Sequence, residues 1–330
     1  MLRLALACCL AAFAALPALA RCQGSNLIAA LPAETRAALR AAADAAPFAQ
    51  GNFWRATRGG QVLHLIGTFH LDDPRHAAIV ARLAPVIDSA STILVEAGPA
   101  EEAALQDALA ADPSLIYLTG GPSLAETLPP ATWDRLKAAL RARSIPPFLG
   151  STMRPVYLSV LLSTPPCASK DPAASQNGLD RRIIDQSLSS QVPVQALEPF
   201  MTVFGVFAQM TDQQQLDMLT LSLALAGQSE DMLTTLQDAY FAEDSRIFWE
   251  FSRWQALNAP GANPDTAARD FAMMEEQLVS ARNRAWIPVI EAALAGGPVF
   301  AAFGALHLSG QDGVLALLEQ AGFTLERLAL

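Results

Sequence analysis

Short apolar runs, separated by stretches with helical periodicity, dominate the hydrophobic pattern of the chain. Four of them have the length and the Gly, Pro or polar boundaries of buried β-strands: residues 62–68, 91–95, 192–197 and 299–303. A turn at Arg58-Gly59-Gly60 should pair the first run with a strand at 53–57, and residues 323–328 should add an edge strand after a helix at 313–321. Buried strands that alternate with helices are typical of parallel sheets. We therefore predict an α/β fold with a mostly parallel central sheet and crossover helices.

A long helical region separates the third predicted strand from the fourth. One helix should begin after an N-cap at Thr211, and a later one should run past Phe271 until Pro288 kinks or ends it. We interpret residues from about 200 to 295 as a helical, lid-like insertion in a single α/β domain that spans residues 21–330.

The N-terminus has the pattern of a cleaved export signal. A basic start at Arg3 is followed by an apolar run over residues 4–16 and by the small residues Ala18 and Ala20. Residues 1–20 are therefore predicted to be a signal peptide, which places the protein in the periplasm or outside the cell after cleavage near Ala20. No later run is long enough for a stable membrane span. The net charge of -10 argues against nucleic-acid partners.

Cleavage at that point would leave two of the four cysteines, Cys22 and Cys167. In an oxidising compartment they could form one disulfide that ties the N-terminus to an irregular loop. The alternative is two unrelated thiols.

Two Gly-x-x-His motifs carry the strongest chemical signal. Gly67-Thr68-Phe69-His70 follows the first predicted strand, and Gly304-Ala305-Leu306-His307 follows the fourth, in a chain with only 4 histidines. Glu96 and Glu198 close the second and third strands. Because ligands of open α/β sheets bind outside the carboxyl ends of the strands, we expect these four side chains to share one site.

Two histidines with one or two carboxylates are typical ligands for a divalent metal ion such as Mn, Co or Zn. Such an ion would support hydrolysis of an amide or ester. The sequence does not decide whether Glu96 or Glu198 is a ligand or a general base. A His-Glu-x-x-His motif, a Gly-x-Ser-x-Gly motif and a Gly-rich phosphate loop are all missing from the sequence.

The other two histidines have plainer interpretations. His64 lies inside the first predicted strand and is expected to be a hydrogen-bonded strand residue. His76 is expected to be exposed near the start of a helix.

The chain resembles the TraB/PrgY/GumN family, whose relatives include the Tiki-type metalloproteases. The resemblance covers roughly residues 50 to 330 and rests on residues 65–71 (LIGTFHL), Val95-Glu96, Arg154-Pro155, Gly178-Leu179-Asp180, Ala196-Leu197-Glu198, Arg282-Asn283 and residues 303–310 (FGALHLSG). It implies that His70, Glu96 and His307 bind the metal, and that Arg282 and Asn283 orient substrate or stabilise an oxyanion.

Other matching positions are expected to contact substrate or to support the ligands: Gly67, Arg154, Asp180 and Gly304. The segment Arg154-Pro155-Val156 departs from the Lys-Pro-Trp expected of the family.

The sequence therefore predicts an exported, metal-dependent, peptidase-like hydrolase with catalytic candidates Glu96, Glu198, Arg282 and Asn283. Its partner would be a peptide or another small substrate. One rival is a non-catalytic periplasmic binding protein that sequesters a peptide or a haem-like ligand, which would hold its ligand even after chelation. The other rival is a degenerate site with a structural role.

Overall fold

The computed structural model describes residues 22–169, 177–259 and 263–330, so the predicted signal peptide lies outside the described residues. The described strands form one six-stranded sheet in the order β4-β3-β5-β2-β1-β6. Their bounds are β1 Phe53–Arg58, β2 Gln61–Thr68, β3 Thr92–Val95, β4 Val194–Ala196, β5 Val299–Gly304 and β6 Thr324–Arg327. All four predicted buried strands, the hairpin strand and the edge strand are confirmed.

Four of the strands, β4, β3, β5 and β2, run parallel, whereas β1 pairs antiparallel with both β2 and β6. The register aligns Thr68 with Gly304 across β2 and β5, and Val95 with Ala302 and Ala196 across β3 and its two neighbours. The carboxyl ends of the four parallel strands therefore reach the same edge of the sheet. The predicted α/β class with a mostly parallel sheet is confirmed.

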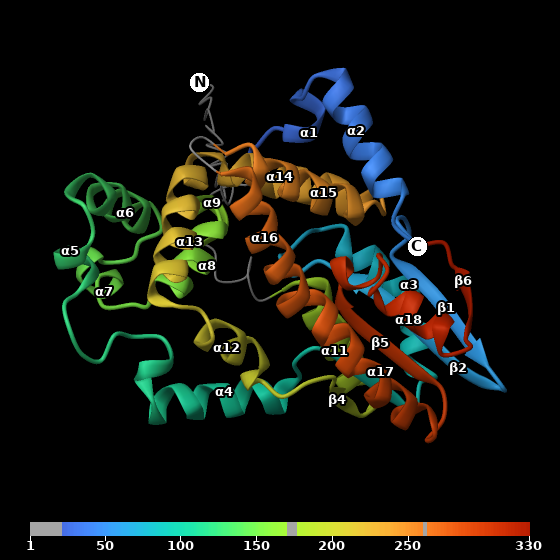
Figure 1. Cartoon of the computed structure of the whole chain (residues 1–330). Helices are drawn as coiled ribbons and strands as arrows, with labels where there is room; N and C mark the ends of the chain where they lie inside the picture. The colour runs from blue at the N-terminus through green and yellow to red at the C-terminus, as the bar shows by residue number, and fades with distance from the viewer. Residues whose placement is uncertain (1–21, 170–176, 260–262) are drawn as a thin grey trace, which may run out of the picture.

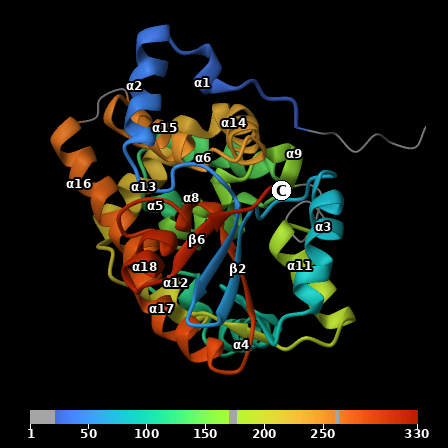
Figure 2. The same cartoon turned by 90° about the vertical axis from the view of Figure 1, so that its right-hand side faces the viewer.

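Helices cover both faces of this sheet, as Figure 2 shows with α17 and α18 on one side and α3 and α11 on the other. The alternation of side chains along β5 divides the core accordingly. Phe300 and Ala302 pack with α3, α11 and α14, whereas Ala301 and Phe303 pack with α17 and α18. A strand buried on both faces has no polar side to alternate, which explains its unbroken apolar sequence.

A separate block of helices lies beside the sheet (Figure 1). It consists mainly of α4 to α9, between β3 and β4, together with α13. Its own core includes Leu140 of α6, Leu158 of α8 and Leu219 of α13. Thr211 caps α13 as predicted, because its hydroxyl accepts a hydrogen bond from the Gln214 N–H.

The bounds of the helices that cover or flank the sheet are α1 Leu27–Ala30, α2 Ala33–Asp44, α3 His76–Asp88, α11 Leu179–Ser189, α12 Met201–Ala208, α14 Ser229–Phe241, α15 Ser245–Leu257, α16 Pro264–Glu275, α17 Ala281–Leu294 and α18 Val314–Gln320. Those of the helical block are α4 Pro99–Ala111, α5 Leu124–Thr127, α6 Pro130–Ala142, α7 Pro147–Gly150, α8 Pro155–Ser163, α9 Pro166–Ser169 and α13 Asp212–Leu225. Short 3₁₀ turns are η1 Pro113–Leu115, η2 Ala226–Gln228 and η4 Ala305–His307, and η3 Glu276–Ser280 is a π-helical turn.

The long helical region before β5 contains α12 to α17. Of the two outcomes expected at Pro288, a kink or an end, the second does not occur, because α17 continues to Leu294. A proline inside a helix costs about 3 kcal/mol. Burial of Trp286, Ile290 and Leu294 against the sheet offsets that cost, since each large apolar side chain contributes about 1.5–3 kcal/mol.

Three further observations concern the remaining predictions. Cys22 and Cys167 form a disulfide. His64 lies in β2 and stacks on Phe53, but within the described residues its side chain has no hydrogen-bond partner. In the described part of the chain, no helix is both long enough and apolar enough to cross a membrane.

The prediction that His76 is exposed is wrong, since the side chain is fully buried. Its ring lies among those of Phe69, Tyr240 and Phe241 because the first turn of α3 packs against the end of α14. Neither ring nitrogen has a hydrogen-bond partner among the described residues.

Candidate functional site

Four predicted site residues converge at the carboxyl edge of the sheet: His70, Glu96, Gly304 and His307. Glu96 directly follows β3, and His70 and His307 lie just beyond β2 and β5. A Cβ atom built on Gly304 would lie 3.1 Å from His70 Nε2, 3.4 Å from Glu96 Oε1 and 3.7 Å from His307 Cδ2. Gly304 therefore marks the point where the three side chains meet, and any larger residue there would push them apart.

Arg282 of α17 links the two carboxylates of the cluster. Its Nη2 donates to Glu96 Oε2 and to Glu198 Oε1, both at 2.6 Å, and its Nε lies 3.0 Å from each oxygen of Glu198. Trp286, one helical turn later, donates its indole N–H to Glu198 Oε2 at 2.9 Å. Glu198 thus holds the guanidinium in place, and the guanidinium presents the same Nη2 to Glu96. A buried ion triad of this kind depends on every member being hydrogen-bonded.

Glu96 is an ionised carboxylate in this setting. Burial favours the neutral acid, but the nearby His307, His70 and Arg282 and the hydrogen bond from the Gly304 N–H, 2.7 Å long, lower the pKa of Glu96 to about 2. His307 is itself neutral at neutral pH, so the positive charges of His70 and Arg282 support the anion there.

His307 is buried, and its Nδ1 lies 2.6 Å from the side-chain oxygen of Asn283. The amide nitrogen of Asn283 donates to the Asp312 carbonyl at 2.8 Å, which fixes the amide so that its oxygen faces the ring. Nδ1 therefore carries the proton and Nε2 the lone pair. Burial first, and then the positive charge of Arg282, lower the pKa of His307 to about 4.

His70 has opposite surroundings. Its side chain is 60% exposed, and its Nδ1 lies 3.2 Å from an oxygen of Asp180. Desolvation by neighbouring groups opposes a charge on the ring, but the Asp180 hydrogen bond and the charges of Glu96 and Asp180 raise the pKa of His70 to about 9. Water at the exposed face screens part of these charges.

The segment Gly178-Leu179-Asp180 explains how Asp180 reaches His70. A Cβ on Gly178 would lie 2.3 Å from the His70 carbonyl oxygen, so that only glycine permits this approach. The Leu179 N–H then donates to the Phe69 carbonyl at 2.9 Å, and its side chain is fully buried. Asp180 follows in the first turn of α11, one residue past the contact.

Gly67 has a comparable packing role beneath the first Gly-x-x-His motif. A Cβ there would lie 2.7 Å from Leu308 and 2.8 Å from the Ala305 Cα atom. Its carbonyl accepts a hydrogen bond from the Tyr240 hydroxyl at 2.9 Å, and its N–H donates to the Asn52 carbonyl at 2.8 Å. The two motifs therefore pack directly on each other.

One residue of the family motifs, Arg154, lies apart from the cluster in the structure. Arg154 precedes α8 in the helical block, where its Nε donates to the Ser114 carbonyl at 2.8 Å, and it has no hydrogen bond to the cluster. Three residues of the site were missed by the sequence analysis: Asn52, Tyr240 and Trp286. Of these, Trp286 had a usable signal, because it lies four residues after Arg282 and so on the same helical face.

The predicted metal ligands are not arranged as a metal site in the described residues. Within residues 22–169, 177–259 and 263–330, no group of three or more His, Cys, Asp or Glu side chains is close enough together to hold a metal ion. Arg282 contacts two of the expected ligands, with Nη1 3.4 Å from His307 Nε2 and Nη2 bonded to Glu96. The donor types are nevertheless appropriate. In both histidines an oxygen acceptor binds Nδ1, which is how proteins orient a ring that uses Nε2 as a ligand.

Comparison with known proteins agrees with this arrangement of motifs. The chain is similar to YbaP, an uncharacterized protein of Escherichia coli strain K12, with 25% identity over 262 residues that cover 79% of this chain and 89% of YbaP. YbaP of Shigella flexneri matches with the same identity and coverage. The model of the TraB/PrgY/gumN family matches residues 52–327, a span that includes both Gly-x-x-His motifs and every residue of the cluster. The chain therefore belongs to the TraB/PrgY/gumN family.

Proposed function

We propose that this protein is a metal-dependent hydrolase of peptide-like amides whose reaction centre is the cluster around Gly304. The observation that supports it most is the matched orientation of the two histidines. Asp180 and Asn283 each bind an Nδ1 atom, which leaves Nε2 of each ring as the nitrogen that could bind a metal ion beside the ionised Glu96. The ion would have to displace the proton that His70 carries at neutral pH.

His70, Glu96 and His307 would hold the metal ion, and their nitrogen and oxygen donors suit Mn, Co or Zn. When bound, such an ion lowers the pKa of a water molecule and polarises a carbonyl group. Binding would require Arg282 to move away from Glu96 Oε2 and His307 Nε2.

Arg282 is the group best suited to stabilise negative charge on a reacting carbonyl oxygen. Glu198 and the Leu278 carbonyl would keep its guanidinium beside the cluster after it leaves Glu96 and His307, so the Nη hydrogens released from those two residues would be free to bind a carbonyl oxygen. Glu96, the ionised carboxylate beside it, can accept a proton from an attacking water. The exposed His70 marks the side from which substrate enters.

We also propose that the protein functions in an oxidising compartment after export. The N-terminal sequence has the pattern of a signal peptide, and the disulfide between Cys22 and Cys167 is of a kind that persists outside the reducing cytoplasm.

The first test is metal content and metal-dependent thermal stabilisation of the disulfide-bonded protein. Wild type should bind Mn, Co or Zn, and the double variant His70→Ala plus His307→Ala should lose the ion and the stabilisation. His64→Ala is the matched control, because His64 lies on the same strand as Gly67 but outside the cluster, and it should bind metal like wild type.

The second part of the test is cleavage of a fluorogenic peptide library with and without a chelator. Metal-dependent cleavage that the double variant lacks is the expected result. Absence of any bound metal would overturn the proposal. Stoichiometric capture of a peptide or haem that persists in chelator, without turnover, would favour a binding protein instead.

A further inference from the structure

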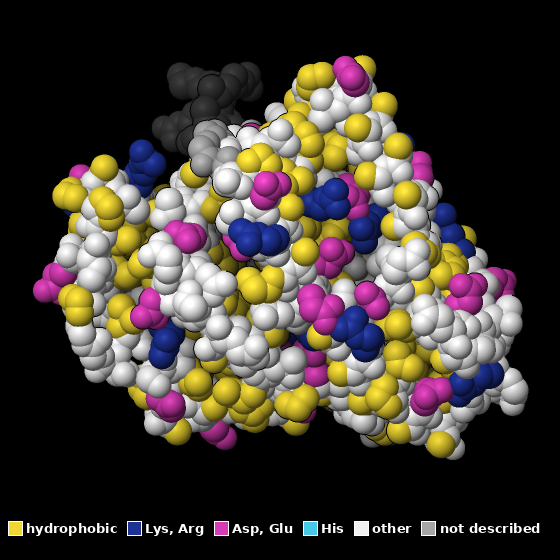
Figure 3. Space-filling view, viewed as in Figure 1, with side chains coloured by type: hydrophobic (Ala, Val, Ile, Leu, Met, Phe, Trp, Pro, Cys, Tyr) yellow, Lys and Arg dark blue, Asp and Glu magenta, His cyan; other side chains and the backbone are white. Residues whose placement is uncertain are grey.

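A polar cavity lies on the far side of the turn that carries His307. Its volume is about 490 Å³, within the range of small-molecule sites. The end of α2, the helix α15, the junction of α16 with η3 and the loop 306–313 enclose it. Figure 3 shows Lys and Arg side chains next to Asp and Glu side chains on the surface over α15 and α16.

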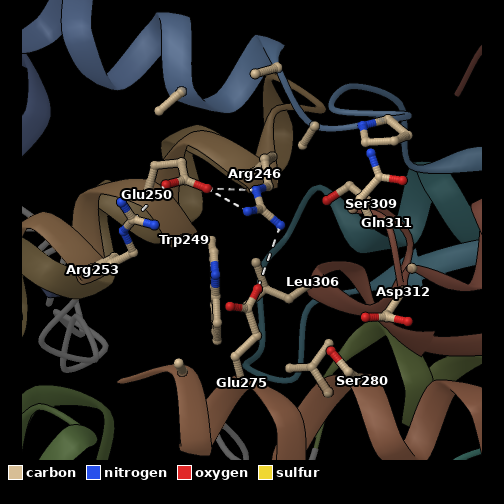
Figure 4. Close-up of a pocket in the computed structure, with 18 of the residues that line it drawn as sticks. Arg246, Trp249, Glu250, Arg253, Glu275, Ser280, Leu306, Ser309, Gln311 and Asp312 are labelled. Atoms are coloured by element: carbon tan, nitrogen blue, oxygen red, sulfur yellow. Dashed lines mark hydrogen bonds and ion pairs between the residues drawn. The ribbon is translucent and has the colours of Figure 1, made fainter. Parts of the chain in front are cut away.

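The charged side chains that line this cavity differ in how many hydrogen bonds they make. Glu250 is buried and accepts hydrogen bonds from Nε and Nη2 of Arg246. The third nitrogen of that guanidinium, Nη1, lies 3.9 Å from Glu275, which is too far for a hydrogen bond. Figure 4 draws this contact as the dashed line that joins Arg246 to Glu275. The Nη1 atom and the carboxylate thus form a long ion pair that no hydrogen bond completes, and both border the cavity.

A second cation borders the same space. Arg253 is 54% exposed, and its Nε lies 4.0 Å from Oε2 of Glu250, a carboxylate whose other oxygen binds Arg246. In Figure 4 the ring of Trp249 stands between Arg253 and Glu275. The cavity therefore has two cations, Arg246 and Arg253, and an aromatic ring. It also has a partly exposed carboxylate, Glu275, which accepts no hydrogen bond from a described residue.

We propose that this cavity binds a short peptide through both of its free, charged ends. The carboxylate of the peptide would bind Arg253 and Nη1 of Arg246, whose guanidinium can accept planar oxygen pairs. The ammonium group would bind Glu275 and lie against the face of Trp249. A ligand with charges of both signs fits better than a simple anion or cation, since either alone would leave one set of groups unpaired.

The cavity adjoins two segments that carry residues of the reaction centre. Leu306 and Ser309, which line it, flank His307, and Ser280 lies two residues before Arg282. Ser280 is the last residue of η3, and π-helical turns of this kind are frequent at functional sites. The ligand would therefore contact both segments that hold the cluster, although it would not touch the cluster itself.

The test is calorimetric titration of the full, metal-free protein in chelator with alanyl-alanine, N-acetyl-alanyl-alanine and alanyl-alanine amide. The free dipeptide should bind saturably. Each blocked form should bind about ten-fold more weakly or worse, because it lacks one charged hydrogen bond. Glu275→Gln should weaken binding of the free dipeptide by a similar factor, and acetylation should then have little further effect.

Two controls keep the result specific to the cavity. Glu276→Gln alters the next carboxylate along, which Arg284 holds, and should bind like wild type. The double variant His70→Ala plus His307→Ala should also retain binding, because the cavity does not include those rings. Absence of saturable binding at millimolar dipeptide, equal binding of the blocked forms, or loss of binding in the double variant would each overturn the proposal. None of these results depends on whether the protein is a metal-dependent hydrolase.

Discussion

His70 and His307 end the same four-residue pattern, and the structure gives them opposite surroundings. His70 is 60% exposed and pairs with a carboxylate, whereas His307 is 6% exposed and pairs with an amide. The pKa of the first rises to about 9, and that of the second falls to about 4. A motif therefore specifies where a ring lies, but the partner of Nδ1 and the burial of the ring decide whether it carries a charge.

Arg282 connects to this contrast because its cation lies beside both His307 and Glu96. Replacing it with Leu would leave two carboxylates unpaired in a largely buried cluster. We expect a loss of about 3–5 kcal/mol in the free energy of unfolding, measured by urea denaturation. The matched change Arg284→Leu, two residues on, removes an exposed guanidinium paired with Glu276 and should cost much less, because water screens that pair. Equal losses in the two variants would show that the cluster is not a coupled unit.

His76 extends the comparison to a buried ring whose two nitrogens have no hydrogen-bond partner among the described residues. Burial lowers its pKa below 6.5, so the unfolded chain binds a proton there more readily than the folded one. The free energy of unfolding should therefore fall as the pH drops below 6.5, and His76→Leu should remove that part of the fall. At pH 7 the variant should be within about 2 kcal/mol of wild type, because it exchanges an unsatisfied polar ring for an apolar group of similar size.

His64→Leu is the comparison variant for this prediction. Burial and the charge of Arg55 also lower the pKa of His64, so its replacement should remove a separate part of the fall. Parallel urea denaturation from pH 7 to pH 5 compares the two variants with wild type. A His76→Leu variant as sensitive to acid as wild type would mean that His76 finds a partner when it is protonated.

Asp180→Asn should change the charge of His70 with the smallest effect on stability. Loss of the carboxylate should bring the pKa of His70 down from about 9 towards 6.5, as followed by NMR titration of the imidazole in metal-free protein. A raised folded-state pKa stabilises the protein fully below 6.5, and this contribution disappears as the pH rises to about 9. The stability difference between wild type and variant should therefore shrink over that window. An unchanged His70 titration would assign the shift to Glu96 instead.

Much of this arrangement could be predicted because it depends on local sequence. Apolar runs located the strands, and the polar residues after them identified His70, Glu96 and His307 at one edge. The partners could not be predicted in the same way. Glu198 and Arg282 are separated by 84 positions, and only the packing of α17 on the sheet brings them together. Trp286 and Tyr240 look like ordinary core residues in the sequence. Their polar atoms gain partners only in the folded protein, where the Trp286 indole donates to Glu198 and the Tyr240 hydroxyl donates to the Gly67 carbonyl.

The error at His76 has the same origin. His76 was interpreted from a local rule, a polar residue near a helix start, and tertiary burial outweighed that preference. Burial likewise lets α17 continue past Pro288, where the local rule allowed the helix to end or to kink. Arg154 matched a motif by order and spacing, yet it lies in the helical block, because a motif match carries no information about which layer of the fold a segment joins.

The disulfide between Cys22 and Cys167, two residues 145 positions apart, makes part of the chain a covalent ring. The ring contains β1, β2 and β3 with His70 and Glu96, while Arg282 and His307 lie on the tail that leaves it. A single cut by a protease anywhere in the ring would open it without releasing a fragment. Damage of that kind would be invisible on a non-reducing gel, and two pieces would separate only after reduction. The half of the cluster that includes His70, the more exposed histidine, is therefore held by two covalent connections.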